Sequence, residues 1–507
     1  MPLPTNPNAP WPPEDQKQIQ DDYRRFDAWY SGSPARLAET LGHGAYERIH
    51  GAQREPGLGE RFRFWSQQNY QPERRIRFHL PLASDISTTS ADLLFSDPPT
   101  LRVKDPQQTV TQDYLDTLSY DGHGLWSKVL ESAEVSAALG GVYLRPVWDQ
   151  EMSPRPILTV VHPDVAIPSF RWGRLTEVTF WRKIGEDGAA VYRHLELHAP
   201  GRIRHALYEG TVSTIGTRVP LTEVGDPNLD AIAGSLGPEG DTIEGIPGRI
   251  TAVYVPNMMP NRRHRGMSIG RSDYDGIESL FDGIDETWTS LMRDIRLARA
   301  RVIVASEYLR DNGPGRGATF DVDREVYEAL QMHPDGTDPI TQVQFDIRVQ
   351  EHMQTIEALM TSAVQTAGYN GRTFGIHDST PGDATAAEVH AAERRSFVTR
   401  GKKAQYWQNA LSEVASLMVA IGSEKLGERG LDLNVDIAVD IPDGVQETPE
   451  KTATTIELLN RAQAASVRTK VALLHPDWDE DRVAEEARQI LQEDGIVVDP
   501  MQEGLPV

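Results

Sequence analysis

The sequence contains no cysteine among its 507 residues. Disulfide bonds, thiolate nucleophiles and cysteine-ligated metal sites are therefore excluded. No apolar run approaches the roughly 20 residues that a membrane-spanning helix needs. Residues 1–13 are rich in proline and asparagine and lack the apolar centre of a signal peptide. We expect a protein made in the cytoplasm, with no membrane contact, no metal and no cofactor.

Basic residues are fewer than acidic ones. The sequence has 75 acidic residues and 51 lysines and arginines, which gives a formal net charge of −24. Such a surface repels nucleic acid on average. It argues against a protein that wraps DNA tightly, but it is compatible with one past which DNA slides. The length predicts two to four domains and a large core.

Patterns typical of catalysis are also lacking. The acids of 477–481 miss the glycine and the final glutamate of a calcium loop. The glycines of 313–317 lack the strand and helix that flank a phosphate loop. Ser379 follows His377 and Asp378 directly, whereas triad members lie far apart on rigid elements. We interpret these groups as a capped helix start, a turn and a loop, and we predict that the protein is not an enzyme.

Apolar spacing predicts several elements in the first 260 residues. A helix is expected over 14–42, and we expect its aromatic face to pack on a neighbour. A second helix over 124–139 ends at two glycines and precedes a strand over 142–148. Residues 155–260 alternate with a period of two, which predicts an antiparallel β region. Within that region we expect a loop over 225–248 and a strand over 250–255.

One long amphipathic helix is expected over 271–300, in the middle of the chain. A strand-like run over 343–349 and a second helix over 348–367 follow a segment of short strands and turns, 302–342. Packing of the two helices on each other fits better than a free coiled coil, because the apolar stripe is short. We expect the stripe to be partly buried in one chain and the acidic side to face solvent or a channel. The stripe consists of Ile277, Phe281, Ile284, Trp288, Leu291 and Ile295.

The last third begins with a loop over 369–384, rich in glycine, proline and serine. A capping box starts the next helix, which runs over 385–421 and is closed by Gly422. Two interpretations stay open for its basic residues: a solvated helix face, or contacts with phosphates or a neighbouring subunit. Two or three short helices are expected over 450–493, with a disordered tail from 495. The basic residues are Arg394, Arg395, Arg400, Lys402 and Lys403.

Five segments in this order resemble those of tailed-bacteriophage portal proteins, of the kind found in siphophages of actinobacterial hosts. Two of them carry short cores, P-L-A-x-D-I with L-L-F-x-x-P-P and T-A-x-E-V. No single core is diagnostic, and the ordered set carries the resemblance. The segments are 11–39, 75–100, 255–289, 383–411 and 449–483.

The resemblance implies an α+β portal fold with a β-rich wing, a two-helix stem, a small α/β clip, a long wing helix and a helical crown. It divides the chain into a wing, a first stem helix, a clip, a second stem helix, a tunnel loop, the long wing helix with a following strand region, a crown and a flexible tail. The corresponding ranges are 1–270, 271–300, 301–345, 346–368, 369–384, 385–445, 446–494 and 495–507.

The resemblance also implies a function. Portal proteins form a homo-oligomeric ring of twelve at one capsid vertex, and double-stranded DNA is packaged and ejected through the channel. The expected partners are the large terminase, the major capsid protein, the scaffold and the head–tail adaptor, in the virion and, during assembly, in the host cytoplasm. Arg372, Thr373, Phe374 and His377 would face DNA from the tunnel loop. The alternatives are a non-portal assembly or scaffold protein with a helical stalk, and a metal-dependent nucleic-acid enzyme.

Overall fold

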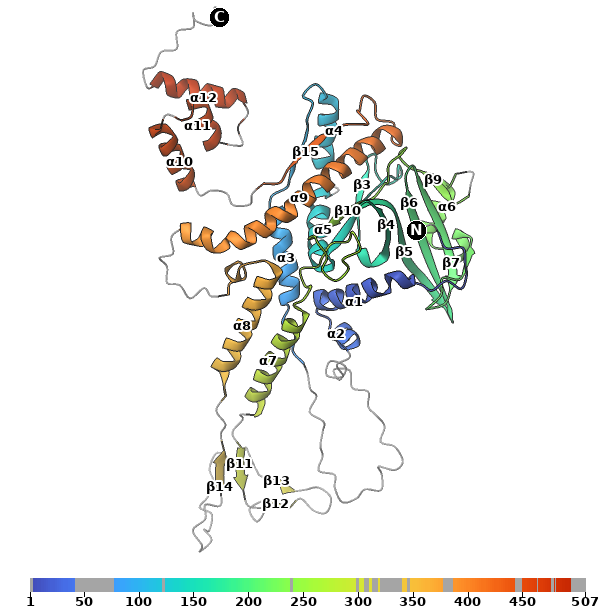
Figure 1. The fold of residues 1–507 in the computed structure, drawn as a ribbon, viewed down its shortest axis with the longest axis vertical. Helices are drawn as coiled ribbons and strands as arrows, with labels where there is room; N and C mark the ends of the chain where they lie inside the picture. The colour runs from blue at the N-terminus through green and yellow to red at the C-terminus, as the bar shows by residue number, and fades with distance from the viewer. Residues whose placement is uncertain are drawn as a thin grey trace, which may run out of the picture. The chain divides into compact units, whose positions relative to one another are not determined.

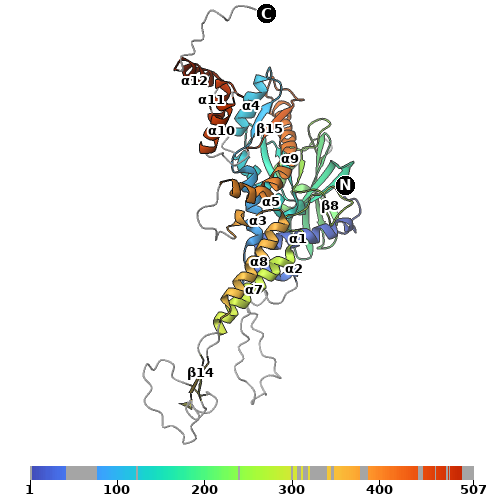
Figure 2. The same cartoon turned by 60° about the vertical axis from the view of Figure 1, so that its left-hand side comes forward.

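The protein divides into two compact units, Met1–Pro442 and Asp443–Val507, which are described separately. The computed structural model is shown in two views in Figures 1 and 2. The residues that it describes are 3–41, 77–120, 124–237, 240–297, 301–304, 310–311, 318–319, 340–343, 347–376, 386–442, 449–462, 464–475, 478 and 480–493.

The first unit mixes helices and antiparallel sheets, which confirms the α+β class. Its helices are α1 (Lys17–Ser31), α2 (Pro34–Leu41), α3 (Leu82–Phe95), α4 (Thr109–Tyr120), α5 (Leu125–Leu139), α6 (Pro227–Ser235), α7 (Glu278–Leu297), α8 (Val349–Ala367) and α9 (Ala386–Glu424). Its strands are β1 (Thr100–Val103), β2 (Gly141–Val147), β3 (Ile157–Val161), β4 (Ala166–Arg171), β5 (Arg174–Asp187), β6 (Ala190–Ala199), β7 (Arg202–Gly210), β8 (Thr217–Val219), β9 (Thr242–Glu244), β10 (Val253–Pro256), β11 (Arg301–Val304), β12 (Arg310–Asp311), β13 (Ala318–Thr319), β14 (Ile340–Val343) and β15 (Ile437–Asp440).

Two antiparallel sheets occupy the predicted β region. One runs in the order β4-β5-β6-β7-β8, with β9 paired to β7, and the other in the order β10-β2-β3. The prediction of an antiparallel β region is confirmed. The prediction of a plain loop over 225–248 is wrong, because α6 and β9 lie within it. The Asp226 side chain caps α6 by accepting hydrogen bonds from the backbone N–H groups of Asn228 (2.9 Å) and Leu229 (3.2 Å).

The aromatic face of α1 packs inside its own chain. Phe26 and Trp29 are buried, and the Trp29 ring centroid lies 5.5 Å from that of Phe281 in α7. The neighbour expected for this face is therefore another helix of the same chain. Burying such rings supplies much of the apolar area that stabilises the core around α1, α3 and α7.

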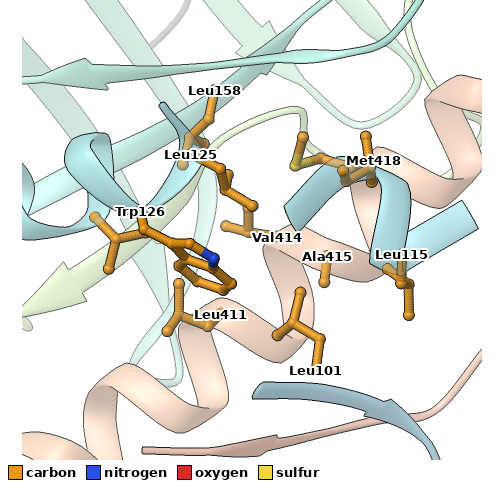
Figure 3. A pocket seen from close by; sticks show the side chains of 11 residues that line it. Leu101, Leu115, Leu125, Trp126, Leu158, Leu411, Val414, Ala415 and Met418 are labelled. Carbon is orange, nitrogen blue, oxygen red and sulfur yellow. The ribbon is translucent and has the colours of Figure 1, made fainter. Parts of the chain in front are cut away.

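The second half of α9 packs against apolar side chains of α4 and α5. Figure 3 shows Leu411, Val414 and Met418 of α9 facing Leu115 of α4 and Trp126 of α5. Burial of large apolar side chains stabilises each by about 1.5–3 kcal/mol. This part of α9 is therefore a rigid support for the elements that pack on it.

The helix α9 is longer than predicted and continues past Gly422 to Glu424. The prediction that Gly422 closes the helix is wrong. A Cβ atom at this position would lie 2.3 Å from the Tyr114 hydroxyl oxygen. The glycine therefore makes room for Tyr114 of α4, inside the helix.

The described residues of the second unit form the helices α10 (Pro449–Arg461), α11 (Val467–Leu474) and α12 (Glu480–Glu493). This agrees with the short helices expected over 450–493. A small core of Val471, Val483 and Ala487 joins α11 to α12. The Ser466 side chain accepts a hydrogen bond from the Thr469 N–H (3.2 Å) and so caps α11.

Candidate functional site

The two central helices pack on each other, as the sequence predicts. A Cβ atom on Gly283 of α7 would lie 3.6 Å from Leu359 Cδ1 of α8, which shows how closely the two approach. Near the other end of the pair, His352 Nε2 lies 3.0 Å from Asp294 Oδ2. The strand expected over 343–349 does not match the observed elements at its two ends. The strand β14 ends at Val343, and the helix α8 begins at Val349.

The helix α7 starts seven residues later than predicted, at Glu278. Ser272 and Tyr274 lie in the turns before it and tie this segment to the core. The Ser272 hydroxyl donates to the Ala138 carbonyl oxygen (2.5 Å), and the Tyr274 hydroxyl donates to the Ala83 carbonyl oxygen (2.7 Å). The start of α7 is therefore set by tertiary contacts as well as by its apolar period.

The apolar stripe of α7 is buried near the core and exposed at the far end. Ile277, Phe281, Ile284 and Leu291 are buried, Trp288 is half-buried, and Ile295 is 43% exposed. Partial burial of the stripe within one chain is thus observed. Ile347, Val349 and Met353 at the start of α8 are exposed as well.

The sequence predicted that the acidic side of α7 faces solvent or a channel. In the structure, part of this side is instead covered by another segment of the chain. Residues 77–80 run along it, and the buried Asp285 carboxylate accepts a hydrogen bond from the Leu80 N–H (2.9 Å). His79 Nδ1 lies 2.8 Å from the same carboxylate, and Arg77 forms an ion pair with Asp282. Two of the acids are therefore neutralised by a neighbouring segment of the same chain.

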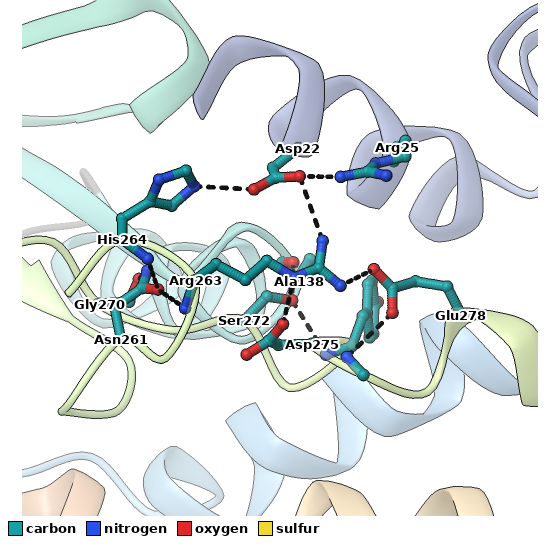
Figure 4. A network of polar contacts seen from close by, with 12 residues as sticks. Asp22, Arg25, Ala138, Asn261, Arg263, His264, Gly270, Ser272, Asp275 and Glu278 are labelled. Carbon is teal, nitrogen blue, oxygen red and sulfur yellow. Dashed lines mark hydrogen bonds and ion pairs between the residues drawn. The ribbon is translucent and has the colours of Figure 1, made fainter. Parts of the chain in front are cut away.

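A network of polar contacts joins α1 to the start of α7, and Figure 4 shows it around Arg263. The Arg263 guanidinium pairs with Asp22 (3.1 Å), Asp275 (2.5 Å) and Glu278. Burial alone would raise the pKa of Asp22, but hydrogen bonds from His264 and Arg25 and the charge of Arg263 lower it. The carboxylate therefore stays ionised and keeps α1 attached to the start of α7.

The described part of the expected tunnel loop, up to Ile376, is docked on α9. Its 3₁₀ turn, η7 (Gly371–Phe374), is capped by Asn370, whose side chain accepts from the Arg372 N–H (3.1 Å). The Ser396 hydroxyl of α9 accepts from the Asn370 N–H (3.0 Å) and lies 3.0 Å from the Thr373 hydroxyl. Side chains and backbone of this segment thus hold it against the helix.

The predicted loop residues lie in different places. Arg372, Thr373 and Phe374 are half-buried, and the Phe374 ring packs edge-on against Tyr369 with centroids 6.0 Å apart. This differs from the expectation that Arg372 and Phe374 are loop tips. His377 lies outside the described residues, as do Ser379 and the glycines of 313–317.

The basic residue Lys403 lies in the core, where sequence analysis expected a solvated face or a phosphate contact. Its ammonium donates to Ser90 Oγ (2.7 Å), Asp273 Oδ2 (2.6 Å) and the Tyr369 hydroxyl (2.8 Å). All three N–H bonds are used. The side chain therefore joins α9 to α3, to the segment before α7 and to the end of α8.

The carboxylate in this cluster is satisfied too. Asp273 Oδ1 accepts from Asn257 Nδ2 (2.7 Å), and Oδ2 accepts from the Tyr369 hydroxyl (2.9 Å). Burial lowers the pKa of Lys403, and the adjacent Asp273 carboxylate opposes that shift. Burial and then Asp273 raise the pKa of Tyr369 well above its usual range. Sequence analysis missed Asp273, Tyr369 and Ser90, since no local pattern marks their meeting.

The other basic residues of α9 divide into two groups. Arg400 is buried and donates to the carbonyl oxygens of Leu93 (2.7 Å) and Pro442. Its contacts are therefore within the chain, unlike the predicted phosphate or inter-subunit contacts. Arg394, Arg395 and Lys402 are exposed, and the prediction remains open for them.

The sequence predicts no metal site and no membrane contact, and two observations on the described residues concern these expectations. Among them, no group of three or more histidine and acidic side chains is arranged to hold a metal ion. Within the same ranges, no helix is both long and apolar enough to cross a membrane.

Comparison with known proteins gives a family match along most of the chain. The model of the family described as "Phage portal protein, SPP1 Gp6-like" matches residues 13–495. No curated protein matches the chain.

Solved structures with similarity to the chain come from gene transfer agent (GTA) particles. One is the virion of a native GTA particle, at 14% identity and a TM-score of 0.41, over 78% of this chain and 89% of that chain. Another is the neck of an empty GTA particle computed with C6 symmetry, at 15% identity and a TM-score of 0.42, over 78% and 90% of the two chains. With the family model matched over residues 13–495, the chain belongs to the SPP1 Gp6-like family of phage portal proteins.

Proposed function

We propose that this portal protein forms a ring of twelve copies at a capsid vertex, around a channel through which double-stranded DNA is packaged and ejected. The family match over residues 13–495 is the observation that carries this proposal. Portal proteins are structural, and we propose that this chain has no enzymatic activity of its own. It would dock the large terminase, the major capsid protein, the scaffold and the head–tail adaptor. The site of action would be the virion, with assembly in the host cytoplasm.

The domain assignment follows the observed elements. We propose that α7 and α8 form the stem, that β11 to β14 belong to the clip, and that the second unit, with α10 to α12, forms the crown. The two antiparallel sheets and the helices α1 to α6 would make up the wing. The predicted boundaries at 270, 345 and 445 fall between these elements.

Exposed apolar side chains at the far end of the stem support the ring. Ile295, Val349 and Met353 are each between 43% and 45% exposed. Such side chains gain free energy when a partner covers them. In a ring, the neighbouring stem is the surface available to do so.

We propose contact with DNA for fewer of the loop residues than the sequence predicts. Arg372, Thr373 and Phe374 support the base of the tunnel loop, because they are half-buried against α9. His377 stays a candidate for the DNA-facing part. The exposed Arg394, Arg395 and Lys402 are candidates for weak phosphate contacts or for contacts with a neighbouring subunit.

Electron microscopy of the purified full-length chain tests the proposal directly. We expect rings with a central hole wide enough for duplex DNA. Monomers or filaments at assembly concentrations would contradict it. Nuclease or ATPase activity that survives purification would favour the enzyme alternative.

A packaging assay tests the assignment of the loop. Replacing Arg372, Phe374 and His377 together with alanine should leave rings intact and change DNA packaging or retention. A matched variant with Gln405 and Gln408 of α9 replaced by alanine serves as the control. Unchanged packaging by the triple variant would remove the loop base and His377 from the DNA-contacting site.

A further inference from the structure

The hairpin of β4 and β5 ends in an unusual two-residue turn. Arg171 and Arg174 are direct cross-strand partners, so that Trp172 and Gly173 form the turn. Both turn residues have positive φ, 54° for Trp172 and 77° for Gly173. This is the pattern of a type I′ turn, whose sequence preference is Asn-Gly or Asp-Gly.

Tryptophan is an unfavourable residue for this left-handed backbone conformation. Left-handed φ crowds a Cβ atom against the following carbonyl oxygen and is disfavoured about ten-fold for ordinary residues. Among the described residues, Trp172 is the one non-glycine with positive φ. A bulky residue in this region is an outlier that calls for a cause outside the turn itself.

The arginines that close the turn add a second unfavourable feature. Like charges directly opposite each other on two strands destabilise the hairpin. Both side chains are exposed. Glu413 of α9 is a carboxylate on which the charge of Arg174 acts, and its stronger cationic neighbour is Arg249. The Glu413 carboxylate is shared between Arg249 and Arg174, and it therefore does not explain why two arginines lie at this tip.

Exposure is the third feature. Trp172 is 95% exposed, whereas Trp29 and Trp407 are each 1% exposed and lie in the core. The Trp172 side chain therefore contributes almost nothing to the packing of its own chain. Three local departures from stable folding at one tip indicate that the residues serve a contact. Tryptophan and arginine are the residue types that most often dominate binding energy.

We propose that the Trp172 tip, residues 171–174, is an anchor that docks on a neighbouring copy of this chain. The inference rests on the ring of the proposed function. In a ring every contact joins two different faces of the subunit, so an exposed tip on one face can meet a recess or surface on the next. The net charge of −24 makes the surface of a second copy acidic on average, which complements the two arginines.

Cross-linking identifies the occupant. A photoreactive phenylalanine analogue replaces Trp172 in the full-length chain, and the purified protein is irradiated in the presence of duplex DNA. We expect an adduct of two 56.5 kDa chains, with the tip joined to a peptide of the second chain. An adduct with DNA, or cross-links within single chains alone, would overturn the proposal. The same analogue at the exposed Met152, on the β2–β3 hairpin, is the matched control.

Two variants separate docking from folding. Trp172→Asn installs the preferred turn residue, so the subunit should unfold at the same or a higher temperature. Its rings should nevertheless need at least ten-fold more protein for half-maximal assembly, and Trp172→Ala should show the same assembly loss. Met152→Ala should assemble as the natural sequence does.

The outcomes distinguish the two proposals. If the natural sequence forms no rings, the proposed function fails. If it forms rings and Trp172→Asn assembles at the same concentration, the docking of the tip fails while the ring stands. A Trp172→Asn subunit that is less stable than the natural one would assign the tryptophan a folding role and also overturn the inference.

Discussion

Two neighbouring lysines of α9 have opposite environments. Lys402 is exposed, whereas Lys403 is 1% exposed and has all three N–H bonds in hydrogen bonds. One step along a helix turns a side chain by about 100°, so adjacent positions reach different surroundings. A dense run of basic residues is therefore no measure of how much positive charge a surface presents.

The difference also separates two roles. The buried cation holds together α3, α8, α9 and the segment before α7, and its removal would leave the Asp273 carboxylate unpaired in the core. The exposed cations are free to contact a ligand or a neighbour without any cost to the fold. The predictions that follow are ordered by the size of the expected effect.

Replacing Lys403 with methionine should lower the free energy of unfolding by about 3–5 kcal/mol, because a buried carboxylate loses its counter-charge. Urea denaturation of the subunit measures this. Lys402→Met is the matched control and should change stability by less than about 0.5 kcal/mol. Adding Asp273→Asn to Lys403→Met should recover part of the loss. Equal stability of the two lysine variants would refute the comparison.

Acid should destabilise the sheet of β4 to β8 through a buried histidine pair. His194 and His205 stack on β6 and β7, with Nε2 and Nδ1 3.2 Å apart. Burial, and then the charge of His205, lowers the pKa of His194 to about 4. In the unfolded chain the His194 imidazole is protonated near pH 6.5, whereas in the folded chain it stays neutral down to about pH 4. The free energy of unfolding should therefore fall by about 3 kcal/mol between pH 6.5 and pH 4.

The measurement is urea denaturation as a function of pH, for the natural sequence and for His194→Gln. Stability contributed by the neutral imidazole is present above pH 6.5 and is lost below it. The variant should show a shallower decline over this window. Parallel curves for the two proteins would mean that other groups, such as carboxylates, cause the acid sensitivity.

Arg400→Ala should cost about 2 kcal/mol in the free energy of unfolding. The guanidinium donates to the Leu93 and Pro442 carbonyl oxygens, and charge-assisted hydrogen bonds of this kind contribute about 1.5–3 kcal/mol. The exposed Arg395→Ala is the control for a lost guanidinium without burial. Thermal unfolding measures the stability of both variants. Equal losses of stability in the two variants would contradict the prediction, because they would show that the buried contacts of Arg400 are unimportant.

Changing Arg394, Arg395 and Lys402 together to glutamine should have the smallest effect on the fold, within about 0.5 kcal/mol, because exposed charges contribute little to stability. Ring assembly or DNA packaging should change instead. A stable subunit with normal rings and normal packaging would exclude these three residues from any contact site.

Much of the fold follows from local sequence signals. The helix before Gly140-Gly141 and the strand after it were predicted because a glycine pair interrupts the apolar period at that point. The paired helices α7 and α8 were predicted from a period of 3.6 in two segments. The helix α6 was missed, although Asp226-Pro227 is a readable start signal, because the surrounding residues have the composition of a loop.

The sequence predicted less of the candidate site than of the fold. Lys403, Asp273 and Tyr369 meet from positions 130 and 34 residues apart, so no local window could reveal the cluster. Gly422 looked like a helix stop because the approaching Tyr114 lies on a different helix. The turn at Trp172 contradicts its sequence preference, and a local reading would place asparagine there instead.

The length of α9 has a mechanical consequence. Its 39 residues make a rod about 58 Å long at 1.5 Å per residue. Its buried side chains extend from Ser396 to Ile421, and its first turns begin at Ala386. A tilt of the whole rod by about 5° would displace one end relative to the other by about 5 Å, roughly the rise of one helical turn. Because buried side chains fix α9 at many points between Ser396 and Ile421, the rod can tilt only together with the elements packed on it. The helix therefore couples the apolar contacts around Met418 to the η7 segment that docks on Ser396.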